Sequence, residues 1–244
     1  FSARRSMKCF YNLLSANCKS HETTLYCCIV KRTGLDFMQE GPFRQNTKRQ
    51  QDIHWKPETE VMATKYSKRI TLKNGLECRI RNGTESDGQA IFDNFNLTHG
   101  QTDYMLTYPD ENHSDGVQEG QFLKEKSESE NEVELVAVVD HTIVGTAGIE
   151  ALGTKYKIRH RAGFGISISR EYWGLGIGQA LLAACIECAR TAGYIQLELN
   201  VVSENVRALS LYEKAGFVEY GRNPKGFRSR MTGFQEVVYM RLEL

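Results

Sequence analysis

Residues 171–194, EYWGLGIGQALLAACIECARTAGY, place three glycines two residues apart directly before a run that is typical of an amphipathic helix. Apolar side chains recur on one face of that helix, at Ile177, Leu181, Cys185 and Cys188. The preceding residues 162–169, AGFGISIS, have the pattern of a strand, so the order is strand, glycine turn, helix. Such a turn exposes main-chain N–H groups at the positive end of the helix, where they can bind phosphate oxygens.

The glycine turn alone does not identify its ligand. Gly174, Gly176 and Gly178 lack the neighbouring lysine and hydroxyl residue of a nucleotide-hydrolysing P-loop. The dinucleotide-binding fingerprint has a different glycine spacing and usually lies in the first strand-helix unit of a domain. A tight turn that only packs the helix on a sheet is a further alternative, because glycines are common in turns.

From residue 62 onward, strand and helix patterns alternate along the chain. Strands are predicted at residues 76–83, 133–140, 142–152, 162–169, 194–202, 218–223 and 234–244. Helices are predicted at residues 177–192, at 203–217, and at 85–101 with Ala90, Ile91, Phe95 and Leu97 toward the core. Residues 109–131 are polar and predict a solvated loop or helix. The alternation predicts an α/β fold with a central mixed, twisted sheet of about seven strands and helices on both faces.

Composition limits the class of protein. The chain has 244 residues, 41% of them hydrophobic and 25% charged, which is ordinary for a soluble globular protein. No apolar run approaches the roughly 20 residues needed to cross a bilayer, so no membrane association is expected. The formal net charge of +1 gives no reason to expect a nucleic-acid partner. No apolar stretch like that of a signal peptide occurs, and a cytoplasmic location is expected.

The cysteines and the charges divide the chain near residue 61. Residues 1–61 contain four of the seven cysteines, ten Lys and Arg against six Asp and Glu, and no sustained periodicity. They are expected to be an appendage, weakly structured or a non-native leader, with a transit peptide as an alternative. Residues 62–244 are the expected domain, and Met62 is its natural start. No second cysteine pair lies at metal-ligand spacing, so reduced structural thiols and no metal site are expected.

A second motif favours a ligand-binding role for the glycine turn. WGLGIG at residues 173–178, followed about 30 residues later by NVRALSLYEKAGF at residues 205–217, resembles the GNAT superfamily of acetyl-CoA-dependent N-acetyltransferases. The resemblance covers roughly residues 70–244 and implies a GNAT-like sheet with acetyl-CoA as cosubstrate. It implies that the pyrophosphate is held mainly by main-chain amides of the loop residues Trp173, Gly174, Leu175, Gly176, Ile177 and Gly178. Trp173 departs from the family consensus of Gln or Arg and puts one side-chain contact in doubt.

The resemblance also implies a site for the pantetheine arm. In this family the strand before the loop splays from the next strand, and its main-chain groups, here at Ile166 and Ile168, pair with pantetheine. Asn200, Asn205 and Tyr212 are expected to line the same site. A tyrosine hydroxyl near the thioester sulfur can protonate the departing thiolate as a general acid. From helix position alone, Tyr212 could instead be a packing residue and Asn205 a helix cap.

The general base is not identified by the sequence. Acetyl transfer needs a neutral amine, so a side chain or a water must accept a proton. Family members often carry an acid at positions that are Ala162 and Asn200 in this chain, and neither can serve. His160 and Glu198 lie two residues away on the same strand faces and are the candidate bases. A solvated surface position is the alternative for His160.

Two functions from different classes follow from the resemblance. The first is an acyltransferase that moves the acetyl group of acetyl-CoA to a primary amine by direct nucleophilic attack. The acceptor would be an amine-bearing small molecule, a protein N-terminus or a lysine, and the enzyme a monomer or homodimer. The second is a degenerate domain that binds acyl-CoA as a non-catalytic sensor, which the missing acids at Ala162 and Asn200 favour.

Overall fold

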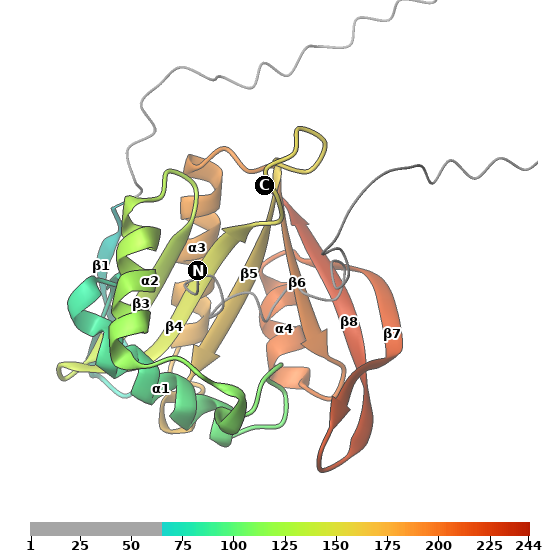
Figure 1. Cartoon of the computed structure of the whole chain (residues 1–244), viewed down its shortest axis with the longest axis horizontal. Helices are drawn as coiled ribbons and strands as arrows, with labels where there is room; N and C mark the ends of the chain where they lie inside the picture. The colour runs from blue at the N-terminus through green and yellow to red at the C-terminus, as the bar shows by residue number, and fades with distance from the viewer. Residues whose placement is uncertain (1–64) are drawn as a thin grey trace, which may run out of the picture. The chain divides into compact units, whose positions relative to one another are not determined.

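In the computed structural model, which describes residues 65–244, the strand patterns form one eight-stranded sheet in the order β1-β2-β3-β4-β5-β6-β8-β7 (Figure 1). The strands are β1 (Ser67–Thr71), β2 (Glu77–Asn82), β3 (Val133–Val139), β4 (Thr142–Ala151), β5 (Arg161–Ile168), β6 (Gln196–Val202), β7 (Val218–Ser229) and β8 (Gly233–Glu243). The strand beyond the expected seven is β1, whose mostly exposed residues give no apolar alternation from which it could be predicted. The expected appendage, residues 1–61, and Met62 lie outside the described residues.

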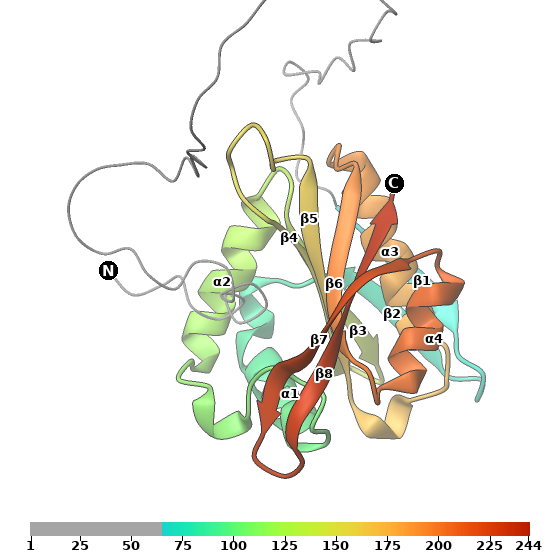
Figure 2. The same ribbon diagram turned by 90° about the vertical axis from the view of Figure 1, so that its right-hand side faces the viewer.

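Helices cover both faces of the sheet, as predicted (Figure 2). They are α1 (Gly88–Gly100), α2 (Gly116–Glu128), α3 (Ile177–Thr191) and α4 (Val206–Lys214). On one face, α1 and α2 close a small core made by Ile91, Leu123, Val136 and Ile143. On the other face, α3 and α4 pack on the main core with all four apolar positions predicted for α3 buried. No helix within residues 65–244 is long and apolar enough to cross a membrane.

The inward face of α1 differs from the prediction. Ile91 is buried and Phe95 half-buried, but Ala90 is exposed and Leu97 is 51% exposed. Polar residues take the inward positions instead, because the buried Asn94 amide donates hydrogen bonds to the Ile143 carbonyl and to Ser169 Oγ. Apolar periodicity could not identify this face, since its buried side chains are stabilised by hydrogen bonds.

The sheet opens between β5 and β6, its one parallel strand pair (Figure 1). Pairing is confined to Arg161–Gly163 of β5 and Gln196–Glu198 of β6, after which the two strands separate. On their other sides, β5 pairs with β4 to Ile168, and β6 pairs with β8 along its whole length. The second half of β5 therefore has one unpaired edge, beside which the candidate site lies.

Candidate active site

A groove of about 580 Å³ lies at this opening. Its lining comes from the end of α1 and the loop after it, from β5, from the glycine loop and from α4. Predicted cofactor residues that line it are Ile166, Ile168, Trp173, Gly174, Gly176, Gly178, Asn205 and Tyr212. The structure therefore brings together most of the residues that the two motifs predicted.

The glycine loop needs its glycines for two different reasons. Gly174 (φ 81°) and Gly176 (φ 104°) adopt left-handed backbone conformations that disfavour other residues. A Cβ atom built at either glycine would meet no atom within 4 Å, so both positions face open space. Gly176 is the N-cap residue of α3, and as a glycine it has no side chain to hydrogen-bond the N–H groups of the helix. Gly178 is different, because its Cβ would lie 3.3 Å from Ile168 and 3.4 Å from Leu211. The loop thus leaves the amino end of α3 open to a ligand, with its positive dipole end exposed.

Basic side chains surround this end of the groove. The Arg170 and Arg207 guanidinium carbons lie 5.6 and 5.2 Å from the Trp173 ring centroid, close enough for cation–π attraction. Lys73 also lines the groove, and its amide donates a hydrogen bond to the Leu175 carbonyl. Sequence analysis missed Lys73 and Arg207, although Arg207 lies inside the second motif. Together with the open amides they make a site that suits phosphate groups.

The unpaired edge of β5 presents main-chain groups to the groove. The Ser169 amide donates to Val144 on β4, and peptide groups alternate in direction along a strand, so the Ile166 and Ile168 groups point away from β4. The Ile168 carbonyl is taken by Trp173, whose indole Nε1 donates to it at 2.7 Å. Ile166 and the Ile168 amide remain directed to the groove, where an extended ligand could add to the sheet edge.

Tyr212 and Asn205 have both a structural contact and a place in the groove. The Tyr212 ring, 7% exposed, packs between Phe164 and Phe217 with centroid separations of 6.1 and 5.9 Å. Burial raises the pKa of its hydroxyl well above the usual value, so the group holds its proton at neutral pH. Asn205 caps α4 by accepting a hydrogen bond from the Ala208 amide at 3.2 Å.

The structure does not bring the other predicted site residues into the groove lining. Glu198, 5% exposed, forms a two-pronged ion pair with Arg161, with Nη2–Oε2 at 2.7 Å, and accepts a hydrogen bond from the Tyr220 hydroxyl. The His160 carbonyl accepts the Ile195 amide where β5 begins. Asn200 lies on β6 opposite Tyr239. Their predicted roles rest on the sequence alone.

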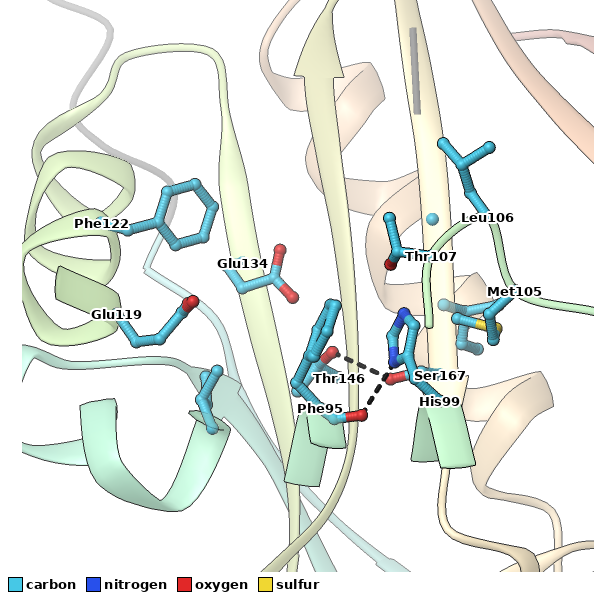
Figure 3. A pocket seen from close by; sticks show the side chains of 13 residues that line it. Phe95, His99, Met105, Leu106, Thr107, Glu119, Phe122, Glu134, Thr146 and Ser167 are labelled. Carbon is cyan, nitrogen blue, oxygen red and sulfur yellow. Dashed lines mark hydrogen bonds between the residues drawn. The ribbon is translucent and has the colours of Figure 1, made fainter. Parts of the chain in front are cut away.

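A smaller inner cavity of about 70 Å³ adjoins the groove, and both are lined by Met105, Ile166 and Ser167 (Figure 3). Glu134 on β3 points into it, and its Oε2 atom is buried with no hydrogen-bond partner. Sequence analysis did not single out Glu134, although a lone charged residue in the apolar strand VELVAVV was a usable signal.

Electrostatics in the inner cavity are set by burial. The pKa of Glu134 is raised to about 8, mainly by burial; Lys126 and Thr146 oppose this rise, and Glu119 and Glu150 contribute to it. Burial lowers the pKa of His99 to about 4. The His99 Nδ1 atom lies 2.8 Å from the Phe95 carbonyl, which can only accept, so Nδ1 donates and Nε2 is left as an acceptor.

Residues 65–244 contain no group of three or more His, Cys, Asp or Glu side chains placed to hold a metal ion. Their cysteines, Cys78, Cys185 and Cys188, are buried free thiols.

Comparison with known proteins agrees with the geometry of the groove. Residues 98–217 match the sequence model of the Acetyltransferase (GNAT) family. The chain is 30% identical over 108 residues to the L-amino acid N-acetyltransferase AaaT of Escherichia coli, covering 44% of this chain and 65% of that protein. It is 34% identical over 87 residues to the N-alpha-acetyltransferase RimI of Mycobacterium tuberculosis, covering 36% and 52%. The matched segments thus span less than two thirds of either relative.

Solved structures give the same assignment for the fold. A GNAT-family acetyltransferase from Streptococcus pneumoniae superposes with a TM-score of 0.66 at 28% identity, covering 68% of this chain and 99% of that one. YncA from Salmonella typhimurium, solved with acetyl-CoA, has a TM-score of 0.61 at 19% identity and covers 68% of this chain and 94% of its own.

Proposed function

This chain belongs to the GNAT family of acetyltransferases, and from that membership we propose that it transfers the acetyl group of acetyl-CoA to a primary amine. The observation that carries the proposal is the groove at the β5–β6 opening, which joins the open glycine loop, the unpaired β5 edge and Tyr212 in one space. The names of the relatives, which acetylate amino groups, support an amine as acceptor.

Each part of the groove has a role in this proposal. Amides at the start of α3, with Arg207 and Lys73 nearby, bind the phosphates of the cosubstrate. The Ile166 edge of β5 and the Asn205 side chain hold the pantetheine arm. Tyr212 donates its proton to the thiolate as the carbon–sulfur bond breaks. Binding and orientation of two substrates account for much of the rate in such a direct transfer.

The roles of His160 and Glu198 as bases remain predictions. Glu198 would first have to give up its contacts with Arg161 and Tyr220. The acceptor is proposed as a small molecule, a protein N-terminus or a lysine.

The test is release of coenzyme A thiol from acetyl-CoA by the full chain, measured with a panel of amines and alongside calorimetric titration of acetyl-CoA. We expect binding of acetyl-CoA and amine-dependent thiol release. A chain that binds acetyl-CoA but acetylates no amine would be the non-catalytic sensor instead. A chain that does not bind acetyl-CoA would contradict both.

A further inference from the structure

The inner cavity beneath α1 and α2 contains a buried carboxyl that the roles above leave unused. We propose that Glu134 is the general base of the reaction: it receives the ammonium group of the acceptor in this cavity and takes its proton. The inference rests on the proposed acetyl transfer. It accounts for the absence of an acid at Ala162 and Asn200.

The sheet places the Glu134 carboxyl close to the β5 edge. Glu134 is the cross-strand partner of Gly148, and Gly148 is the partner of Gly165 on β5. A Cβ at Gly148 would lie 2.1 Å from Glu134 Oε2, so the carboxyl lies directly over Gly148. Adjacent strands are about 4.8 Å apart, which leaves the carboxyl about one strand spacing from Gly165 and Ile166. An amino group between them is within hydrogen-bond reach of Oε2 and beside the groove.

A ligand that donates hydrogen bonds would match the polar atoms of the cavity. Buried acceptors nearly always have a partner, and Glu134 Oε2 has none. His99 presents Nε2 as an acceptor, and the Glu119 carboxyl lies on the α2 side (Figure 3). Of the described residues that line the cavity, none is a lysine or an arginine. The nearby cation, Lys126, forms ion pairs with two other carboxylates. Its Nζ atom lies 2.5 Å from Glu132 Oε2 and 3.8 Å from Glu150 Oε1.

Size and wall chemistry define the class of acceptor. A cavity of about 70 Å³ has room for about five non-hydrogen atoms. Its walls are apolar on the helix side, where Ile91, Phe95 and Phe122 lie. A carboxylate on the ligand would be buried here beside two carboxyl groups, Glu119 and Glu134, with no Lys or Arg among the described lining residues to pair with it. The acceptor is therefore a primary amine with an unbranched apolar stem and no carboxylate near its nitrogen.

Two side chains, Glu134 and Tyr212, move the protons in the proposed step. In its ionised form Glu134 takes one proton from R–NH3⁺, and the neutral nitrogen attacks the thioester carbonyl carbon. As the carbon–nitrogen bond forms, the carbon–sulfur bond breaks, and the sulfur keeps the electron pair and takes the Tyr212 proton. The second nitrogen proton returns to Tyr212, and Glu134 releases its proton to solvent. The products are the N-acetylamine, coenzyme A thiol and one proton per ammonium ion consumed.

The test uses the full chain, acetyl-CoA and two probe acceptors, n-propylamine and its carboxylate-bearing counterpart β-alanine. We expect n-propylamine to have a kcat/KM on the order of 10-fold or more above that of β-alanine. Glu134→Gln keeps the shape but removes the base, so kcat/KM for n-propylamine should fall about 10²-fold or more. The rise of rate with pH attributable to Glu134 should also disappear. Glu134→Asp keeps a carboxyl and should retain that rise with a smaller loss of rate.

Controls separate this inference from the proposed function. Glu125→Gln, on the exposed side of α2, removes a carboxylate from the same helix layer and should change nothing. Acetyl-CoA affinity should be the same in Glu134→Gln as in the parent, and the variant should be at least as stable, because it lacks the loss of stability that ionisation of Glu134 causes. If another amine is acetylated but n-propylamine is not, or if Glu134→Gln keeps the parental rate and pH profile, the inference is overturned and the function stands. If the parent fails to bind acetyl-CoA, the proposed function fails and the inference with it.

Discussion

The indole Nε1 of Trp173 donates a 2.7 Å hydrogen bond to the carbonyl of Ile168, so the glycine loop is tied to the end of β5. The Trp173 ring also supports Arg170 and Arg207, whose guanidinium groups lie over it. These contacts show that Trp173 helps to position the glycine loop.

Trp173→Phe separates these two effects. The ring stays, so the contacts with both arginines should persist, while the hydrogen bond to Ile168 is lost. We expect the free energy of unfolding to fall by about 1 kcal/mol. We also expect the Kd for acetyl-CoA to rise a few-fold because the loop is less firmly held. Urea unfolding and calorimetry measure the two, and unchanged values in both would show that the hydrogen bond does not position the loop.

The glycine loop can be tested with a matched pair of substitutions. Gly176 (φ 104°) and Gly233 (φ 82°) both adopt left-handed conformations, and a Cβ at either meets nothing within 4 Å. Gly176→Ala and Gly233→Ala should therefore lose similar stability, about 1–2 kcal/mol each. Gly233 is the first residue of β8 and lies outside the groove lining, so only Gly176→Ala should weaken acetyl-CoA binding, by about 10-fold or more. Equal affinities in two folded variants would assign the loop a packing role alone.

Burial of Glu134 predicts a dependence of stability on pH. Its pKa is about 8 in the folded chain, against about 4.3 unfolded. Between these values the folded state holds a proton that the unfolded state has lost, so this contribution is complete below the unfolded pKa and declines as pH rises toward 8. His99 has the opposite effect between its folded pKa of about 4 and its unfolded value of about 6.5. Between about pH 4 and 6.5, Glu134 and His99 therefore change the free energy of unfolding in opposite directions. The decline caused by Glu134 should be visible above about pH 6.5.

Urea unfolding at pH 6.5 and pH 8 measures this effect. A single group contributes about 1.4 kcal/mol per pH unit, so the parent should lose about 2 kcal/mol across this window through Glu134. Glu134→Gln should not show that loss. The same decline in both proteins would mean that Glu134 is already ionised in the folded state.

Much of the fold follows from local pattern. The turn-helix unit around α3 was predictable because its glycines and its single apolar face agree with one another. Strand β1 was not, since its residues are mostly exposed and it is held by pairing with β2. The inward face of α1 was missed because the Asn94 side-chain NH2 group donates its hydrogen bonds to residues far along the chain.

One part of the candidate site could be predicted from the sequence, and another part could not. The residues near Gly176 and Asn205 lie in contiguous motifs, so the sequence located them. Glu134 faces the inner cavity only because β3, β4 and β5 align it with two glycines, and that register is a tertiary property. The ion pair of Glu198 with Arg161 could not be predicted from the sequence either, because it depends on the short parallel contact between β5 and β6.

The measurement that tests the account most directly is the steady-state rate of Tyr212→Phe with acetyl-CoA and an amine that the parent acetylates. The substitution keeps the ring between Phe164 and Phe217 and removes the hydroxyl. We predict that kcat falls roughly 10²-fold or more at neutral pH, because a general acid typically contributes 10² to 10⁴. The Kd for acetyl-CoA and the melting temperature should stay close to the parental values, since the interaction is made mainly in the transition state. A Tyr212→Phe variant that turns over at the parental rate would contradict the proposed mechanism and leave Tyr212 a packing residue.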